Sequence, residues 1–382
     1  MTEEQENEQL ILDAVDKFLA RIKPAVHQLE ADDEYPEDIV AEMKEMGLFG
    51  AVIDPQYGGL GLPVSTYAKI VERIACVWMS LTGVFNSHLI MSMSVQRFGT
   101  TQQKEKWLPL FASGEVRGAL ALTEPNCGTD LQAIKTTAKR EGNQYIINGA
   151  KSWITNSLHG SCFALLVKTD TKANPAHHGM SLFIAPKGDG FVMGSKHKKL
   201  GYKGIDTAEF FLDNYTLPAE NLIGLEEGHG LQHALGALAL GRINVAARGI
   251  GVASAALNDS IAYSQERKTF GKPICQHQSI QIYLADMATR VEAARLLVQS
   301  AATAFDRGER CDMEAGMAKL FATEAAMSNS AEALRIHGAY GYSTEFNVER
   351  YYRDAPLLAI GEGTNELQRI IIAKQLIEQN PL

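Results

Sequence analysis

The hydrophobic pattern of this chain changes twice along its length, and that order restricts the fold more than any other feature. Up to about residue 117, apolar residues such as Ile11, Val15 and Phe18 recur at helical spacing. From about residue 119, short β-branched or aromatic runs separated by turn residues indicate strands. These runs are 144–148, 162–167, 180–185 and 208–212. After about residue 228 the pattern is helical again, so the order is helices, strands, helices.

The C-terminal helical region has a regular apolar repeat with alternating steps of four and three residues. Its members are Ile280, Leu284, Met287, Val291, Ala294 and Val298. A repeat of about 3.5 residues favours a left-handed bundle of near-antiparallel helices. No helix separates the strands, which disfavours a parallel Rossmann sheet. We therefore expect an α+β multidomain protein with an N-terminal α-helical domain (1–117), a middle antiparallel β-barrel or sandwich domain (118–227) and a C-terminal four-helix bundle (228–382).

Composition and charge argue against several classes of function. The net charge is -9, and lysines and arginines are scattered, so nucleic acid is not expected as a partner. Five cysteines without metal-like spacing predict free thiols in a reducing compartment, and hence a cytoplasmic protein. His229 and His233 lack a third ligand, so no metal site is expected. The acidic N-terminus resembles no targeting peptide, and we expect no membrane-spanning segment.

One acidic residue, Glu362, lies between two glycines just before an apolar stretch. Glycines allow close backbone approach and left-handed backbone angles. A carboxylate on such a turn can project into a cavity, where partial exclusion of water makes it a stronger base. Taken alone, a Gly-Glu-Gly turn is more often a loop at the start of a helix. Its function as a base therefore depends on which other motifs accompany it.

Four segments and a short Arg-Asp pair accompany this turn. They are Ala-Leu-Thr-Glu-Pro-Asn-Cys-Gly-Thr-Asp at 121–130, Lys-Ser-Trp-Ile-Thr-Asn at 151–156, Glu-Arg-Lys-Thr-Phe-Gly-Lys at 266–272, Arg-Ile-His-Gly-Ala-Tyr-Gly-Tyr at 335–342 and Arg-Asp at 353–354. In this order the segments resemble the acyl-CoA dehydrogenase flavoprotein family, from roughly residue 5 to the end. The resemblance implies the same three-part fold, FAD as cofactor and a homotetramer or homodimer.

The segment at 151–156 offers groups that suit a flavin ring. Trp153 and Thr155 are two residues apart and share one face of a strand, so they present a flat side chain and a hydroxyl together. A strand with one core aromatic is the alternative interpretation. The resemblance implies flavin-ring contacts from Leu122, Thr123, Trp153 and Thr155. It also places Gly128 and Thr129 where the family binds cofactor or acyl-CoA.

A second set of cofactor contacts is implied near the C-terminal helices. Arg267 follows a helical run and suits a pyrophosphate, although a solvated basic helix end explains it equally well. In the family, the residues at Arg267, Thr269, Phe270 and Gln278 reach the FAD of a neighbouring subunit. The remaining implied contacts are Arg335, Gly338, Ala339, Thr364 and Glu366. Arg335 and Ala339 depart from the Gln and Gly that the family often carries there.

The family reaction is α,β-dehydrogenation of an acyl-CoA thioester to the trans-2-enoyl-CoA. Glu362 aligns with the base of the short- and medium-chain members, and flavin N5 accepts the β-hydride. Some members carry the base on a bundle helix instead, but the matching stretch here is Leu240-Gly241-Arg242, without an acid. The resemblance implies substrate contacts from Thr129, Gly241, Arg242 and Gly363. The 81–98 helix, with Ser87 and His88, is expected to line the acyl pocket.

Other functions on the same fold stay open from sequence. They are an acyl-CoA oxidase, a glutaryl-type decarboxylating dehydrogenase and a flavin-containing relative that binds nucleic acid. The last is disfavoured because the chain is acidic and lacks a basic C-terminal region. Electron-transferring flavoprotein is expected as the electron acceptor from the family. The length and branching of the acyl chain are not determined by the sequence.

Overall fold

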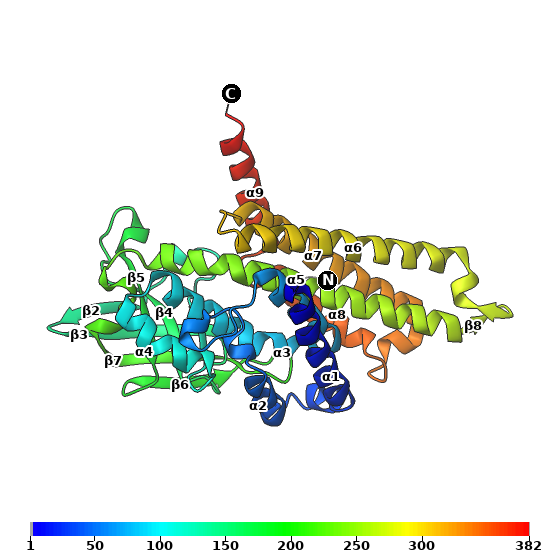
Figure 1. The fold of residues 1–382 in the computed structure, drawn as a ribbon, viewed down its shortest axis with the longest axis horizontal. Helices are drawn as coiled ribbons and strands as arrows, with labels where there is room; N and C mark the ends of the chain where they lie inside the picture. Colours follow the sequence, from blue (N-terminus) through cyan, green and yellow to red (C-terminus); the bar gives the residue numbers. More distant parts are fainter. Residues whose placement is uncertain (1–2, 382) are drawn as a thin grey trace.

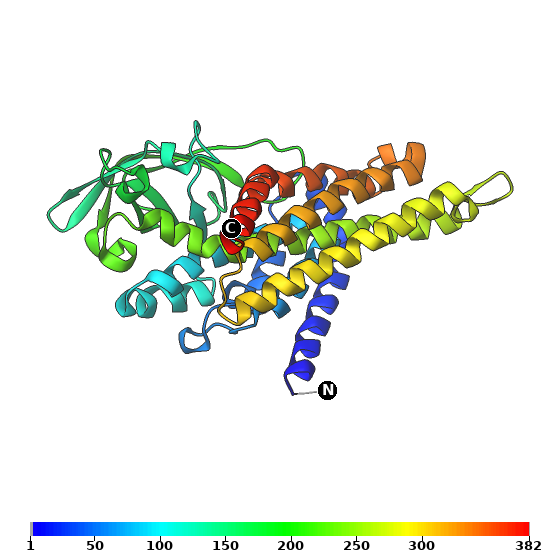
Figure 2. The same cartoon turned by 90° about the horizontal axis from the view of Figure 1, so that it is seen from above.

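The computed structural model describes residues 3–381, with a sheet towards one end and long helices reaching the other (Figures 1 and 2). The first helices are α1 (Glu3–Ala31), α2 (Glu37–Glu45), α3 (Val64–Phe98) and α4 (Thr101–Ala112). α4 begins after Thr100 because Thr100 and Gln103 exchange hydrogen bonds between side chain and backbone. α3 bends at Trp78, whose backbone angles are not helical.

The middle region forms one seven-stranded sheet. Its strands are β1 (Gly118–Ala121), β2 (Thr137–Glu141), β3 (Gln144–Thr155), β4 (Cys162–Lys168), β5 (Met180–Pro186), β6 (Phe191–Lys196) and β7 (Thr207–Pro218). The order is β1-β4-β2-β3-β7-β6, with β5 paired to β4. β4 and β5 are buried along nearly their whole length, which explains why their sequences are continuous apolar runs without alternation.

The C-terminal region consists of long helices that extend away from the sheet (Figure 1). They are α5 (Gly230–Glu266), α6 (Gln278–Asp306), α7 (Asp312–His337), α8 (Val348–Ile360) and α9 (Asn365–Gln379). A hairpin of β8 (Lys268–Thr269) and β9 (Lys272–Pro273) joins α5 to α6 at the end farthest from the sheet. Short 3₁₀ turns lie at Leu48–Gly50, Pro55–Tyr57, Leu131–Ala133, Ala176–Gly179, Ala219–Asn221, Ile223–Leu225, Ile274–Gln276 and Gly338–Tyr342.

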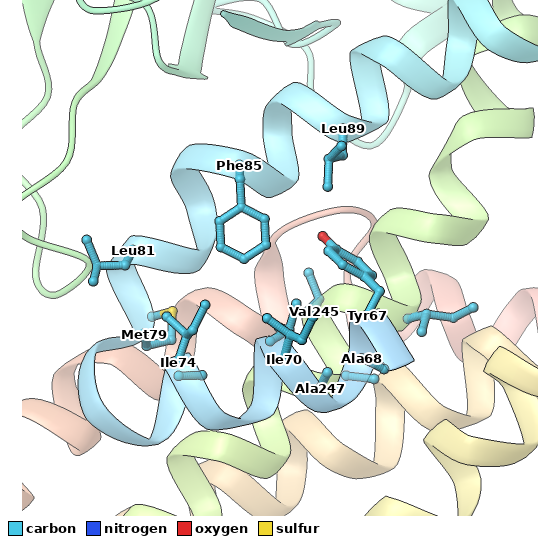
Figure 3. Close-up of a cluster of buried hydrophobic side chains, with 14 of the residues drawn as sticks. Tyr67, Ala68, Ile70, Ile74, Met79, Leu81, Phe85, Leu89, Val245 and Ala247 are labelled. Carbon is cyan, nitrogen blue, oxygen red and sulfur yellow. The ribbon is translucent and has the colours of Figure 1, made fainter. Parts of the chain in front are cut away.

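The main core joins the two helical regions. Side chains of α3, including Tyr67 and Phe85, gather with Val245 and Ala247 of α5 in one apolar cluster (Figure 3). A second, smaller core lies within the sheet region. Because the larger core crosses from the N-terminal to the C-terminal helices, the division at 117 and 227 stays a prediction of the sequence pattern.

Two helices, α3 and α5, are long and apolar enough to cross a membrane by length and composition. The expectation that no segment spans a membrane stays a prediction, because a buried core helix passes the same test of length and composition. In each helix, 83% of the most apolar window is buried inside the protein, so the apolar residues of both helices serve the core.

The expected architecture of helical, β and helical regions is confirmed. The middle sheet differs from the expectation in one respect, because it is mixed and not antiparallel throughout. β4 pairs in parallel with β1 along four residues and with β2 at one position. The short strand runs gave no signal of direction, since a strand buried on both faces reads alike in either orientation.

A buried ion pair fixes the loop between β1 and β2. Lys151 of β3 is fully buried, and its Nζ donates to Glu124 Oε1 at 2.9 Å and to the Leu122 carbonyl at 3.0 Å. Glu124 also accepts from the backbone amides of Lys135 and Thr136, at 2.6 and 3.0 Å. These bonds satisfy both charges and hold the 122–136 segment beside β3.

Replacing Lys151 tests this pair. In Lys151→Met, Glu124 keeps its backbone donors but loses its counter-ion, and we expect the free energy of unfolding to fall by about 3 kcal/mol. Urea denaturation followed by circular dichroism measures the change. The matched control is Lys139→Met, which removes an exposed pair with Glu141 on the same sheet and should leave the midpoint unchanged. Equal midpoints for the two variants would contradict the role of the buried pair.

Candidate active site

The turn that carries Glu362 joins α8 to α9 and has an unusual backbone. Glu362 and Gly363 both have positive φ, at 54° and 88°. The left-handed region suits glycine at 363 but costs about 1 kcal/mol or more for a residue with a side chain. The hydroxyl of Thr364 then accepts from the Leu367 amide and starts α9. A strained glutamate between two helix ends indicates that its direction is imposed by the surrounding structure.

The carboxylate of Glu362 lies between α3 and α5. Its Oε1 accepts a hydrogen bond from Asn86 Nδ2 of α3 at 2.8 Å. Its Oε2 is buried and has no hydrogen-bond partner among the described residues. A Cβ atom at Gly241 of α5 would stand 2.0 Å from Oε2 and 2.8 Å from the Ile90 side chain. Glycine at 241 therefore makes the space in which the carboxylate fits.

The electrostatics of Glu362 suit a base. Burial raises its pKa above the ordinary value, and three cations and one hydrogen bond oppose the rise. The opposing groups, in order of effect, are Arg248, the Asn86 amide, Lys319 and Arg242. The carboxylate is thus more basic than one in water, while the nearby positive charges keep its ionised form accessible.

Lys319 of α7 holds the Glu362 turn in place. Its buried ammonium donates to the carbonyls of Ala359 and Gly363, at 3.2 and 2.8 Å. A third bond, at 2.9 Å, reaches Asn365 Oδ1 at the start of α9. One side chain therefore links the end of α8, the turn and the beginning of α9. Burial lowers the pKa of Lys319 to about 8.

Arg242 follows Gly241 and is also buried. Its NH1 lies 3.2 Å from Asp312 Oδ1, at the start of α7. Its Nε is buried without a hydrogen-bond partner among the described residues. This free donor beside the base is consistent with the expected contact to substrate, which stays a prediction.

The two segments expected at the flavin ring lie side by side, and the ring contacts themselves stay a prediction. The Ser152 amide of β3 donates to the Thr123 carbonyl at 3.0 Å, which sets the 122–123 segment beside Trp153. The Trp153 side chain is 57% exposed, and its ring stacks on His197 with centroids 4.3 Å apart. An exposed indole is a suitable surface for a flat aromatic ring. Gly128 and Thr129 lie nearby along the chain in an exposed loop.

The other expected cofactor residues are far from this group. Arg267, Phe270 and Gln278 lie around the β8–β9 hairpin, at the end of the molecule opposite the sheet (Figure 1). Arg335, Gly338 and Ala339 lie where α7 ends. All six residues are exposed, and Phe270 is 97% exposed. The structure thus puts these two sets of expected cofactor contacts at opposite ends of one chain, while Thr364 and Glu366 lie at the start of α9.

Sequence reasoning missed three residues of the site and misplaced one. Asn86, Lys319 and Arg248 were not identified, although a lone polar residue in an apolar helical stretch is a usable signal. His88 was expected at the acyl pocket, but its Nε2 lies 3.0 Å from the Phe111 carbonyl, on the other side of α3. Burial lowers the pKa of His88 to about 4, as in a neutral core histidine.

The described residues contain no group of three His, Cys, Asp or Glu side chains placed to hold a metal ion. A carboxylate with one buried, unpartnered oxygen and an exposed aromatic side chain, set in a helix–sheet–helix fold, form the arrangement expected of a flavin-dependent dehydrogenase. A flavin ring fits this place because the exposed Trp153 offers a flat apolar surface, and the Ser152 amide holds Thr123 next to it.

Comparisons with known proteins identify the family. Residues 5–115, 119–215 and 228–377 match the N-terminal, middle and C-terminal domains of acyl-CoA dehydrogenase. An acyl-CoA dehydrogenase of Bacillus subtilis is 40% identical over 97% of this chain and 98% of that protein. Butyryl-CoA dehydrogenase of Megasphaera elsdenii has a TM-score of 0.94 at 36% identity, covering 99% of both chains. A chain from the structure of the electron transferring flavoprotein of Acidaminococcus fermentans has a TM-score of 0.94 at 37% identity, covering 99% of this chain and 98% of that one.

The chain therefore belongs to the acyl-CoA dehydrogenase family, and the resemblance seen in its motifs is confirmed. It is an FAD-dependent oxidoreductase that acts on the CH–CH bond of acyl-CoA thioesters.

Adding one carbon at Gly241 tests the space made for Glu362. In Gly241→Ala, the new methyl group displaces the carboxylate, and we expect turnover to fall about 10²-fold because a shift near 1 Å is enough. FAD content, measured by absorbance, should not change. The control is Gly188→Ala, whose added Cβ meets nothing nearer than 4.0 Å. Unchanged turnover in Gly241→Ala would show that Glu362 works from another position.

The charge of Lys319 should be visible in the pH dependence of kcat/KM. The reaction needs ionised Glu362, so activity falls as pH drops through its raised pKa, and the acid limb lies above pH 4.5. Lys319 is charged throughout that range, since its pKa is about 8. In Lys319→Met the lost positive charge raises the pKa of Glu362 further, so the acid limb of kcat/KM moves to higher pH. The turn also loses the three hydrogen bonds of Lys319, and we expect turnover above the acid limb to fall about 10–100-fold because the carboxylate is held less firmly. Lys374→Met, on the exposed face of α9, should leave the profile unchanged.

Proposed function

We propose that Glu362 is the base that removes the α-proton, from C2 of the bound acyl-CoA. The single observation that supports this role is the buried, unpartnered Oε2, held against Gly241 and directed away from solvent. Asn86 occupies the other oxygen and fixes the orientation of the carboxylate. Bound FAD would supply the acceptor for the hydride from C3, and loss of the C2 proton to Glu362 together with that hydride would give a trans-2-enoyl-CoA.

The thioester carbonyl gains negative charge as the α-proton leaves, and a donor must face it. We assign this role to the backbone amide of Glu362. Support comes from its place beyond the end of α8, where the intrahelical hydrogen bonds end with the Gly361 amide. Gly241, Arg242 and Gly363 are the proposed substrate contacts around the same carboxylate, and Thr129 is a further proposed contact from the exposed loop after β1. Of these, Gly241 and Gly363 act by the space and the backbone angle that they allow.

We propose that two copies of the chain complete each cofactor site. Leu122, Thr123, Trp153 and Thr155 would contact the flavin ring of their own subunit. The exposed distal group would contact the cofactor bound to a neighbour, because it lies at the opposite end of its own chain (Figure 2). This group comprises the exposed Arg267, Phe270, Gln278, Arg335, Gly338 and Ala339 together with the half-buried Thr269. Thr364 and Glu366, at the start of α9, complete the proposed contacts, and the assembly would be a homotetramer or homodimer.

Electron-transferring flavoprotein is the proposed electron acceptor. Family membership supports this, as does the similarity to a chain from the structure of the electron transferring flavoprotein of Acidaminococcus fermentans. A cytoplasmic location is a further proposal, and the five free cysteines are consistent with it.

The test of the base is Glu362→Gln. The amide keeps the shape of the side chain but accepts no proton, so we expect FAD to remain bound and flavin reduction by butyryl-CoA to slow by about 10²–10⁴-fold. Anaerobic stopped-flow absorbance of the flavin measures the rate. The control Glu378→Gln changes an exposed carboxylate of α9, and its flavin should be reduced by butyryl-CoA as fast as in the wild type. If the flavin of Glu362→Gln loses its absorbance at the wild-type rate, another group abstracts the proton.

A further inference from the structure

A chain of buried hydrogen bonds begins at Arg248 of α5 and ends on the carboxylate of Glu362. Arg248 Nε donates to Asn244 Oδ1 at 2.6 Å, and Asn244 Nδ2 donates to the Tyr67 hydroxyl at 2.7 Å. The Tyr67 hydroxyl donates in turn to Asn86 Oδ1 at 3.5 Å, and Asn86 Nδ2 donates to Glu362 Oε1 at 2.8 Å. The three residues between the two ends are fully buried, so bulk water cannot replace these partners.

A bend in α3 makes this chain possible. Tyr67 and Asn86 belong to the same helix, and the 19 positions between them would span about 28 Å if the helix were straight. The backbone of Trp78 is not helical, with φ of -153° and ψ of 99°, so α3 changes direction there. Figure 3 shows the Tyr67 oxygen directed at the second half of α3, toward the turns that carry Phe85 and Leu89. The two halves of one helix therefore supply two successive members of the chain.

Arg248 sets the direction of every bond in the chain. A guanidinium has only donors, so Asn244 must present its carbonyl oxygen to Arg248 and its NH2 group to Tyr67. The Tyr67 oxygen then accepts from Asn244, and its single hydrogen is left for Asn86 Oδ1. Asn86 consequently turns its NH2 group toward the carboxylate. Because all these bonds point the same way, each one polarises and strengthens the next.

The chain gives the two oxygens of Glu362 different roles. Oε1 always faces a donor, because a flipped Asn86 amide would set its carbonyl oxygen against the carboxylate and lose the bond from Tyr67. Oε2 is buried without a hydrogen-bond partner among the described residues and lies beside Gly241. A proton arriving at Oε1 would have to displace the Asn86 donor and leave it buried and unpaired, whereas a proton arriving at Oε2 displaces nothing.

We propose that Tyr67 and Asn244 are positioning residues of the reaction, which act through Asn86 to reserve Oε2 for the α-proton. The C2–H bond breaks, an O–H bond forms at Oε2, and the electron pair left on C2 enters the new double bond as hydride leaves C3 for the bound cofactor. This inference rests on the proposed role of Glu362 as the base. Among the described residues, neither Tyr67 nor Asn244 bonds to the carboxylate itself.

The orienting role of this chain can be separated from the charges around the carboxylate. Arg248 and Arg242 of α5 and Lys319 of α7 face the base and oppose the rise in its pKa. The hydroxyls of Tyr67 and Tyr202 also lie near it, but burial raises the pKa of both, so they stay neutral between pH 5 and about pH 9. Removing the Tyr67 hydroxyl therefore changes no charge, and its effect on the base reports orientation.

Tyr67→Phe removes one oxygen atom and keeps the ring. Because Asn86 loses the bond that fixes its amide, we expect kcat for flavin reduction by butyryl-CoA to fall about tenfold, with KM within about twofold of wild type. A weaker donor at Oε1 leaves a stronger base, so the acid limb of kcat/KM should move to higher pH. The control is Tyr351→Phe, which removes another buried hydroxyl, bonded to Asp259 at 3.0 Å beside a separate cavity of about 370 Å³. Its pH profile should match wild type.

A double-mutant cycle tests whether Tyr67 acts through Asn86. Asn86→Ala alone should move the acid limb at least as far as Tyr67→Phe does. In the Asn86→Ala background, Tyr67→Phe should change neither kcat nor the acid limb further, because the link to the carboxylate is already broken. Asn244→Leu, one bond farther away, should act in the same direction as Tyr67→Phe and be equally silent in that background.

Infrared difference spectra across the acid limb identify the oxygen that carries the proton. Subtracting the spectrum of Glu362→Gln isolates the carbonyl band of protonated Glu362. With the proton on Oε2, the Oε1 carbonyl keeps its bond from Asn86, and both Asn86→Ala and Tyr67→Phe should move the band to higher frequency. With the proton on Oε1, the carbonyl is the unbonded Oε2, and neither substitution would move the band.

The outcomes separate this inference from the proposed function. Wild-type flavin reduction in Glu362→Gln overturns the role of the base and, with it, the inference. If Glu362→Gln is slow, then additive effects in the cycle, an unchanged pH profile in Tyr67→Phe or an unmoved carbonyl band overturns the orienting chain and leaves Glu362 as the base. Should Tyr67→Phe not fold, Asn244→Leu replaces it in the cycle and the band of Asn86→Ala decides the oxygen.

Discussion

The site depends on a missing side chain in the packing of α3 against α5. Because position 241 is glycine, the two helices leave a space that the carboxylate of Glu362 fills, with Oε2 against α5 and Oε1 on Asn86 of α3. The same close packing excludes water and makes the carboxylate more basic. The position of the carboxylate and its raised pKa therefore have one cause, and any larger residue at 241 would change both.

Desolvation alone would leave Glu362 protonated and useless as a base, so the surrounding cations matter as much as burial. Arg248, Lys319 and Arg242 come from two helices and oppose the rise in pKa. Lys319 does this while bonding both sides of the strained turn. The strain of the left-handed glutamate is thus offset by contacts from α7, a helix that carries no reacting group.

The sequence predicted those features that depend on local pattern. Helical and strand periodicity gave the order of the three regions, and the Gly-Glu-Gly turn indicated the left-handed backbone that Glu362 and Gly363 adopt. The spacing of Trp153 and Thr155 predicted one shared face of a strand, and this stays a prediction because Trp153 has a positive φ of 61° and β3 pairs irregularly with β7 just there. The direction of β4 was not predictable, because a doubly buried strand has no alternation to orient it.

What the amino-acid sequence determined by itself was the type of each element and the chemistry available on it: a carboxylate on a glycine turn, an indole and a hydroxyl on a strand, and basic residues at helix ends. Only the tertiary structure decided which of these groups meet. Asn86 reaches Glu362 across 276 residues of chain, while its neighbour His88 faces the opposite side of the helix. Contacts between distant residues are set by how helices pack, and a local pattern contains no information on that packing.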